Sequence, residues 1–381
     1  MTPEILITGA GVVSALGCGK AENLAALLAG RTGIGPLQYL KTSLRGFPGG
    51  EVPLSNEELS VLSGAPALWP RTSLLSAVAL KECLQEAGLE DGRGLTLVGG
   101  TTVGGMDLTE QQFPKYAPSH GCGESTELPA HLLGFRRTTT LSTACSSAAN
   151  AIIFAANLIR SGKASCVVAG GSECLSNYHL NGFRSLMILD QAPCRPFDAT
   201  RAGLNLGEGA AYLVLETAEN ARKRGVKALG KLTGFGNACD AFHQTASSEI
   251  GEGAFLAMTR ALFMAGLKPE DIGYVNAHGT GTPNNDASES AALRRVFGEA
   301  IPPVSSTKPF TGHTTSASGS IELVFCLLAL QEGFLPGQLN WNVPDPSCIV
   351  PCPTMKCRVS HILSNAFGFG GNDSALILSR V

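Results

Sequence analysis

The sequence predicts an α/β protein in which largely parallel sheets are covered by helices. β-rich runs alternate with helical runs along the 381 residues, which is typical of layered α/β folds. The apolar share of 44% supports a large buried core, and the 46 glycines indicate tight turns and closely packed helices. A succession of β-run, glycine and helix starts at residue 5 and again near residue 228. We therefore expect two similar halves, 1–227 and 228–381.

In the first half, β-rich or short apolar runs predict the strands, and helical spacing predicts the helices between them. The expected strands are 5–13, 95–98, 165–169 and 209–216. The expected helices are 21–29, 72–87 and 148–160, which stop near Gly30, Gly88 and Gly162. The segments 32–70 and 101–139 hold many turn-forming residues, prolines among them, so we expect irregular structure there.

The second half repeats this alternation. The expected strands are 226–234, 272–277, 303–306 and 374–378, and the expected helices are 253–265, 287–296 and 319–331. Two of the strands, 272–277 and 303–306, each lead into a segment that carries a histidine beside a glycine. We expect both histidines on turns.

Charge, cysteine content and hydropathy bound the class of protein. The net charge of −3 gives no general argument for nucleic acid or an anionic membrane as partner. The 12 cysteines stand in a chain too long to need disulfide staples, so we expect reduced thiols in the cytoplasm. No basic-then-apolar signal segment opens the chain. The longest apolar helical stretch, 321–330, is about half of the roughly 20 residues that a membrane span needs, so we expect no membrane span.

Cys145 is the first candidate catalytic residue. It lies among small residues in the segment 143–148 (TACSSA), just before an expected helix. The positive end of a helix macrodipole lowers the pKa of a thiol, so we expect a thiolate nucleophile. Backbone N–H groups at such a turn also stabilise a developing oxyanion. The alternative is a buried structural cysteine.

His278 and His313 are the next candidates, in the segments 276–282 (NAHGTGT) and 308–313 (KPFTGH). Either one alone is better explained as a histidine in a loop whose hydrogen bonds are satisfied and which has no catalytic role. Together with Cys145 they favour a site, because imidazole exchanges protons or hydrogen bonds near neutral pH. A Cys-His dyad needs only one histidine as base. The second suggests a pair of N–H donors that polarise a carbonyl or an enolate.

Lys308 and Glu322 flank His313 in the sequence. We expect them to form an internal ion pair that holds the histidine segment and adds positive potential. The alternative is a solvated surface pair of little energetic value.

Two other motifs are weaker. Gly9-x-Gly11 follows a strand as in dinucleotide-binding proteins, but the third glycine is missing and no acidic residue stands convincingly about 20 residues on. Cys348, Cys352, Cys357 and His361 could ligate zinc, but two prolines interrupt them and their spacing matches no common site. We expect buried cysteines instead.

A series of motifs resembles the β-ketoacyl-[acyl-carrier-protein] synthases, with a pattern similar to synthase II and the polyketide ketosynthases. The motifs follow one another from end to end of the chain, at residues 7–17, 143–148, 169–173, 195–198, 206–209, 276–282, 308–313 and 364–372. The resemblance implies a thiolase-like fold, with two βαβαβαββ halves in a five-layer α-β-α-β-α arrangement, usually as a dimer. The N-terminal half would carry the cysteine and the C-terminal half the two histidines.

The resemblance also implies a reaction. Cys145 would take an acyl chain from acyl carrier protein, and His278 and His313 would support decarboxylation of a malonyl thioester whose enolate attacks the acyl group. Neither a metal nor an organic cofactor is implied. The other matching residues are Lys308 and Glu322 as supporting pair, Phe369 as gate and oxyanion donor, Asp286 as supporting acid, Thr280 and Thr282 along the pantetheine path, and His243 and Thr245 near the channel mouth.

The chain departs from the family pattern in ways that bear on specificity and pairing. Residues 314–319 (TTSASG) stand where Leu-Leu-Gly-Ala-Ala-Gly is usual, and the chain is shorter than is usual in the family. These departures suggest a specialised synthase, such as one for aryl polyenes or other polyketides, that works beside a chain-length-factor-like subunit. The family resemblance as a whole also implies fatty acid synthesis and a homodimer as options. The alternatives are that the chain is itself such a non-catalytic subunit, or a thiolase, although thiolases place a second cysteine late in the chain.

Overall fold

The computed structural model describes residues 3–381, which form a large mixed sheet with helices on its faces and a separate sheet of two short strands. The first half contains β1 (Ile5–Ser14), β2 (Gly17–Cys18), α1 (Lys20–Ala29), α2 (Asn56–Ser63), α3 (Arg71–Glu86), β3 (Thr96–Gly100), α4 (Met106–Gln112), α5 (Glu124–Leu132), β4 (Arg137–Leu141), α6 (Ser147–Arg160), β5 (Cys166–Glu173), α7 (Asn177–Ser185), β6 (Gly209–Thr217) and α8 (Ala218–Arg224).

The second half contains β7 (Gly230–Cys239), α9 (Glu252–Ala265), β8 (Tyr274–Asn276), α10 (Pro283–Phe297), β9 (Val304–Ser305), α11 (Lys308–Thr311), α12 (Ser318–Glu332), β10 (Phe334–Leu335), β11 (Met355–Lys356), β12 (His361–Gly368) and β13 (Asn372–Ser379). Short 3₁₀ turns lie at Pro118–His120, Pro269–Asp271 and Thr315–Ala317.

The order of the strands repeats between the halves. Along the sheet the order is β4-β3-β5-β6-β1-β7-β13-β12-β8-β9. Each half contributes five strands to this order if β2, β10 and β11 are left out. Counted along the chain in each half, the third strand lies at the edge, followed by the second, fourth, fifth and first. The pairings repeat as well: β3 is parallel to β4 and β5, and β8 is parallel to β9 and β12, whereas the remaining pairs are antiparallel. We propose the division into 1–227 and 228–381, which this repeat supports.

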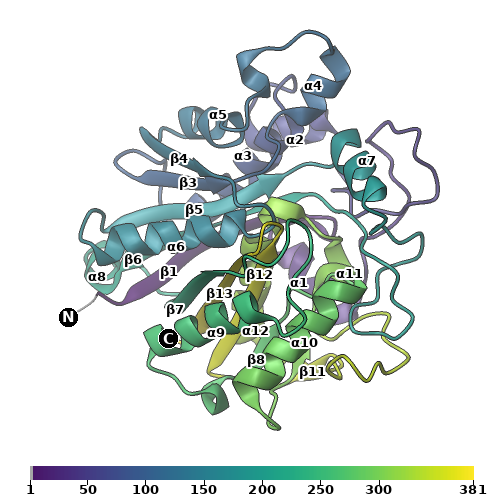
Figure 1. The fold of residues 1–381 in the computed structure, drawn as a ribbon. Coiled ribbons are helices and arrows are strands. Elements are labelled where there is room, and N and C mark those ends of the chain that lie inside the picture. Colours follow the sequence, from purple (N-terminus) through teal and green to yellow (C-terminus); the bar gives the residue numbers. More distant parts are fainter. Residues whose placement is uncertain (1–2) are drawn as a thin grey trace.

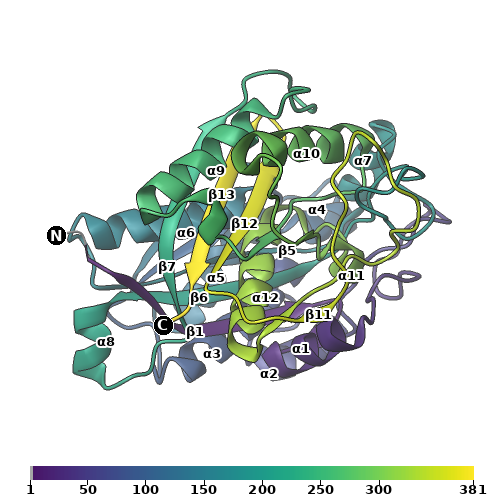
Figure 2. The ribbon, with the colours of Figure 1, turned by 90° about the horizontal axis from the view of Figure 1, so that it is seen from below.

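Five layers result from this arrangement. Helices α6 and α12 pack together between the two parts of the sheet, α3 and α5 cover the first part from outside, and α9 and α10 cover the second. Figure 1 shows α3 and α5 on one outer side of the molecule and α9 and α10 on the other. Figure 2 shows α9 and α10 beside the hairpin of β12 and β13. The expected thiolase-like architecture is confirmed.

Glycines allow the layers to approach closely. A Cβ on Gly11 of β1 would lie 2.1 Å from the carbonyl oxygen of Ala79 on α3, and one on Gly9 would lie 2.4 Å from that of Cys83. These two glycines therefore serve packing of helix against strand rather than phosphate binding. A Cβ on Gly319 would lie 2.9 Å from the backbone nitrogen of Ala149, so this glycine lets α12 approach α6.

Several sequence predictions were wrong in detail. The sheet is mixed rather than largely parallel, because β6 and β13 run antiparallel to their neighbours. The segment 32–70 contains α2, whose start is fixed by a capping box of Ser55 and Glu58. The segment 101–139 contains α4, α5 and most of β4. Gly170 and Gly171 lie inside β5 instead of ending it, because they pair with Tyr212 and Ala211 of β6.

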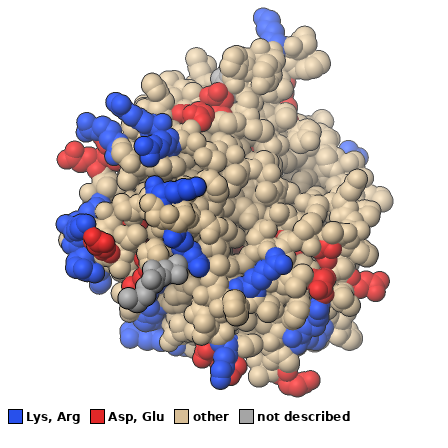
Figure 3. Space-filling model, turned by 60° about the vertical axis from the view of Figure 1, so that its left-hand side comes forward, with Lys and Arg blue, Asp and Glu red and all other residues tan. Residues whose placement is uncertain are grey.

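Across residues 3–381, no helix is long and apolar enough to cross a membrane. In the same range, Cys348, Cys352, Cys357 and His361 form no group of three that could hold a metal ion. On the face drawn in Figure 3, acidic side chains lie among the basic ones, and much of the surface carries neither.

Candidate active site

Three distant turns meet at one cavity of about 280 Å³. Cys145 comes from the turn between β4 and α6, His278 follows β8, and His313 lies between α11 and α12. All three line the cavity together with Phe369, which stands on the turn between β12 and β13. The other lining residues include Thr245, Thr280, Thr282, Phe183, Ile188 and Leu204.

A strained turn holds Cys145 at the start of α6. Ala144 has a φ of 52°, which is unfavourable for a residue with a side chain. The Ser147 hydroxyl donates to the Ala144 carbonyl at 2.6 Å and so supports this conformation. The Cys145 side chain is buried, and the backbone N–H groups of Phe369 and of Cys145 itself act on it by lowering the pKa of the thiol. Both N–H groups are therefore candidate donors to the oxygen of an acyl group that the sulfur attacks.

The expectation of a lowered cysteine pKa was wrong. Burial raises the pKa of the Cys145 thiol to about 12, although the Lys308 ammonium and the two N–H groups lower it. Burial outweighs these effects because a thiolate loses its hydration in a closed cavity. In the free protein Cys145 is therefore a thiol at neutral pH, and its proton must be transferred when the sulfur attacks.

The two histidines face each other edge to face, with ring centroids 5.2 Å apart. Burial, and next the Lys308 ammonium, lower the pKa of both imidazoles well below the usual value, so both are neutral near pH 7. His278 Nδ1 lies 3.3 Å from Lys308 Nζ. An ammonium only donates hydrogen bonds, so Nδ1 accepts and the proton of His278 resides on Nε2.

His313 is held through both its backbone and its ring. Its N–H donates to the Asn205 carbonyl at 2.7 Å, and its carbonyl accepts from Gly207 N–H at 2.9 Å. Its Nδ1 lies 3.0 Å from the Ser318 hydroxyl, which in turn lies 3.3 Å from the Thr314 hydroxyl. With Thr314 donating to Ser318 and Ser318 to Nδ1, every hydroxyl proton in this chain has an acceptor. In that arrangement His313 also carries its proton on Nε2.

Lys308 and Glu322 form a fully internal ion pair. Their side chains are only 1% and 3% exposed, and Lys308 Nζ donates to Glu322 Oε1 at 2.7 Å. Burial raises the pKa of Glu322, while Lys308 opposes that shift. The surface-pair alternative is therefore excluded, and the ammonium places positive charge beside both imidazoles and the Cys145 thiol.

Two buried carboxylates on α10 hold the turn that carries His278, Thr280 and Thr282. Glu289 accepts from the backbone N–H groups of His278 and Gly279 at 2.9 and 2.8 Å, and burial raises its pKa to about 7. Asp286 accepts from the N–H groups of Thr280 and Gly281 at 3.1 and 3.2 Å. Asp286 therefore lies beneath the turn rather than in the cavity, as a supporting acid.

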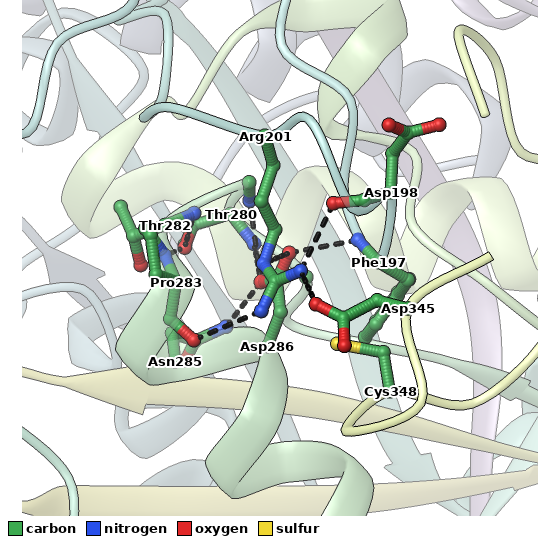
Figure 4. Close-up of polar contacts among 12 residues, drawn as sticks. Phe197, Asp198, Arg201, Thr280, Thr282, Pro283, Asn285, Asp286, Asp345 and Cys348 are labelled. Carbon is green, nitrogen blue, oxygen red and sulfur yellow. Dashed lines mark hydrogen bonds and ion pairs between the residues drawn. The ribbon is translucent and has the colours of Figure 1, made fainter. Parts of the chain in front are cut away.

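Arg201 links this turn to a second loop. Its guanidinium lies 3.7 Å from Asp286 Oδ2, contacts Asp345, and donates to the Asp198 carbonyl at 2.9 Å. Figure 4 shows Arg201 between Asp286 and Asp345, with Thr280 and Thr282 on the far side of Asp286. The Thr280 and Thr282 hydroxyls lie 2.8 Å apart and line the cavity.

The structure thus brings together Cys145, His278, His313, Lys308, Glu322, Phe369, Thr280 and Thr282. Thr245 lines the same cavity, whereas His243 is exposed and its Nδ1 accepts from the Thr245 N–H at 3.1 Å. Sequence reasoning missed Glu289, Arg201 and Ser318. The signal for Glu289 was its position three residues after Asp286, which places both acids on one face of a helix.

Comparison with known proteins identifies the family. The chain matches the models described as "Beta-ketoacyl synthase, N-terminal domain" over residues 2–221 and "Beta-ketoacyl synthase, C-terminal domain" over residues 229–342. The chain belongs to the β-ketoacyl synthase family. As a β-ketoacyl synthase it is a condensing enzyme of the acyltransferase type, and the thiolase alternative is set aside.

Relatives of this β-ketoacyl synthase match over its whole length. It is 35% identical to nodulation protein E of Rhizobium meliloti over 410 residues, covering 100% of both chains. It is 33% identical to 3-oxoacyl-[acyl-carrier-protein] synthase 2 of a Synechocystis strain, covering 99% of this chain and 98% of the relative. Among solved structures, the ishigamide ketosynthase/chain length factor superposes with a TM-score of 0.93 at 30% identity, covering 100% of both chains.

Proposed function

We propose that this synthase extends an acyl chain held on Cys145 with a two-carbon unit from malonyl-acyl carrier protein. The observation that carries the proposal is the single cavity shared by Cys145, His278 and His313, with Lys308 beside them. The name of the Synechocystis relative supports an acyl carrier protein as the donor.

The first step is acyl transfer. The Cys145 sulfur attacks the carbonyl carbon of the acyl thioester, the N–H groups of Cys145 and Phe369 stabilise the oxyanion, and the pantetheine thiol leaves with the proton of Cys145. No electron is gained or lost, and no metal or organic cofactor is required.

The second step is decarboxylative condensation. The malonyl carboxylate leaves as CO₂, and the resulting enolate oxygen accepts hydrogen bonds from the Nε2–H groups of His278 and His313. The enolate carbon then forms a bond to the acyl carbonyl carbon, and the bond from that carbon to the Cys145 sulfur breaks. The released sulfur takes up a proton from solvent and returns to the thiol. Lys308 helps by holding His278 through Nδ1 and by stabilising negative charge in the cavity.

The remaining residues serve the entry path and the framework. Thr280, Thr282 and Thr245 would contact the pantetheine arm, with His243 near the mouth. Glu322 and Asp286 would support Lys308 and the threonine turn. The chain would work as a homodimer, or as a heterodimer with a chain-length-factor-like subunit, for which the ishigamide structure offers a precedent by its name. Its pathway would be fatty acid, aryl polyene or other polyketide synthesis, and a cytoplasmic location remains a prediction.

Variants at the three cavity residues test these roles. Cys145→Ala should lose covalent capture of the acyl group, whereas His278→Ala and His313→Ala should keep part of the acylation and lose condensation. Acyl capture by Cys145→Ala, or full condensing activity in both histidine variants, would contradict the assignment. A non-catalytic chain-length-factor role predicts instead that even the wild-type chain takes up no acyl group.

A further inference from the structure

A partly buried cluster of amides and hydroxyls ties the turn of Phe369 to the turn of Cys145. Asn372 is the first residue of β13 and follows Phe369 by three residues. Its Oδ1 accepts from the Ser146 hydroxyl at 2.9 Å, from Asn150 Nδ2 at 2.7 Å and from Asn237 Nδ2 at 3.0 Å. Three donors from the Cys145 turn, α6 and β7 thus converge on one oxygen.

Asn150 anchors the opposite side of this cluster. It lies in the first turn of α6 and donates from Nδ2 to the Thr143 hydroxyl at 2.8 Å as well as to Asn372. Its Oδ1 accepts from Asn237 at 3.0 Å and from the Ser374 hydroxyl at 3.1 Å. Asn150 therefore contacts the segment just before Cys145 and the strand just after Phe369.

The backbone between these anchors is tightly constrained. A Cβ on Gly368 would lie 2.8 Å from the Thr143 carbonyl oxygen, so the two turns are in close contact. Gly370 and Gly371 have φ values of 83° and 76°, which make a sharp turn. Gly371 N–H donates to the Gly368 carbonyl at 3.0 Å, and Gly370 N–H donates to the Gln244 carbonyl at 2.8 Å. Little freedom remains for the Phe369 N–H once Asn372 is fixed.

This geometry matters because the two oxyanion donors come from different parts of the chain. The Cys145 N–H belongs to the start of α6, and the Phe369 N–H belongs to the β12–β13 turn. Both N–H groups lower the pKa of the Cys145 thiol, which indicates that both lie near its sulfur. A donor pair assembled from two segments works only if something fixes the distance between them.

We propose that Asn372, together with Asn150, is a positioning residue that sets the spacing of the Cys145 and Phe369 N–H groups for acyl transfer. The inference rests on the proposed function, because it assigns the cluster to the step in which the thioester oxygen becomes an oxyanion. In that step the S–C bond to Cys145 forms, the bond to the donor sulfur breaks, and the thiol proton of Cys145 passes to the leaving thiol. Neither asparagine touches the substrate.

Two reactions at the same sulfur separate this role from a merely structural one. Acylation by an acyl-acyl carrier protein develops an oxyanion, whereas alkylation by iodoacetamide develops none at the reacting carbon. Asn372→Leu should therefore slow acylation of Cys145 by roughly 10²-fold, the order expected on losing one oxyanion donor, and should slow alkylation far less. Asn372→Asp keeps the accepting oxygen and should retain acylation within about tenfold of wild type.

The matched control is Asn157→Leu, the same substitution at an exposed position farther along α6, which should leave both rates unchanged. Asn150→Ala gives a second route to the same prediction if Asn372→Leu does not fold. Equal slowing of acylation and alkylation, or acylation that is unaffected in both variants, would overturn the inference. Wild-type acylation is measured first: its absence refutes the proposed function, whereas its presence with parallel rate losses refutes only the positioning role.

Discussion

Removal of either partner of the Lys308–Glu322 pair should destabilise the protein, and the two losses should depend on pH in opposite directions. Both side chains are almost completely buried and 2.7 Å apart. Breaking a buried pair by removing one partner costs about 3–5 kcal/mol, because the other charge is left without compensation.

The loss in free energy of unfolding of each variant has an upper limit, because the partner that remains can give up its charge by gaining or losing a proton. In Lys308→Met, protonating the remaining carboxylate at pH 7 costs about 3.7 kcal/mol, since an ordinary Glu titrates near 4.3 and each pKa unit corresponds to about 1.4 kcal/mol. In Glu322→Gln, removing a proton from the remaining ammonium costs about 4.6 kcal/mol, from an ordinary Lys value near 10.4. We therefore expect losses of about 3–4 kcal/mol for Lys308→Met and about 3–5 kcal/mol for Glu322→Gln.

The signs of the pH dependence follow from proton binding. In Lys308→Met the pKa of Glu322, which burial already raises, rises further, so the folded state binds more protons than the unfolded state. The stability of this variant relative to wild type should fall as pH rises above about 4.3, by up to about 1.4 kcal/mol per pH unit. In Glu322→Gln the folded state binds fewer protons, so relative stability should increase with pH.

Urea unfolding of wild type and both variants at pH 6, 7 and 8 measures these differences. The control is Lys223→Met, which breaks the exposed pair of Lys223 and Glu219 on α8 and should change nothing measurable at any of these pH values. Losses no larger than that of Lys223→Met, or losses that do not vary with pH in either variant, would refute the description of an internal, charged pair.

Three further predictions concern the cavity and the packing around it. Because burial raises the pKa of Cys145 to about 12, its alkylation rate should increase about tenfold per pH unit from pH 7 to 9; a plateau below pH 8.5 would contradict this. Arg201→Met should raise the KM for the carrier-bound substrate about tenfold with a smaller change in kcat, because Asp286, which holds the turn of Thr280 and Thr282, loses the cation beside it. An unchanged KM would show that Arg201 does not position these two threonines for substrate binding. Gly319→Ala should lower the free energy of unfolding by about 1–3 kcal/mol through overpacking against Ala149. The control Gly182→Ala on α7, where a Cβ meets no atom within 4 Å, should not lower it. Equal effects of the two substitutions in urea unfolding would contradict the close contact between α6 and α12.

The sequence was most informative where local chemistry repeats with recognisable spacing. The turns of Cys145, His278 and His313 are identified from their small neighbours. Half of the twelve α-helices in residues 3–381 are predicted within a few residues of their ends, namely α1, α3, α6, α9, α10 and α12. Gly30 and Gly266, for example, end α1 and α9 in the left-handed conformation expected of a terminal glycine.

Long-range contacts could not be predicted in this way. The expectation of a lowered pKa for Cys145 considered the start of the helix but not the burial of the thiol, and burial is the largest effect on that pKa. Asn372 lies 222 residues from Asn150, and no local pattern reveals that their side chains meet. The mixed sheet was missed because local patterns do not give the direction of a strand relative to its neighbours. Residues 165–169 and 209–216 are both expected as strands, yet β5 and β6 pair antiparallel. In the second half β12, the antiparallel partner of β13, was not predicted.

The most direct test of the central claim is mass spectrometry of the protein after incubation with an acyl-acyl carrier protein, followed by addition of malonyl- or acetyl-acyl carrier protein. The acyl mass is expected to appear on Cys145. On addition of the malonyl carrier the acyl mass should leave, with release of CO₂ and formation of a β-ketoacyl carrier two carbons longer; the acetyl carrier should have no effect. Acylation that persists in Cys145→Ala, or extension by the acetyl carrier without release of CO₂, would contradict it.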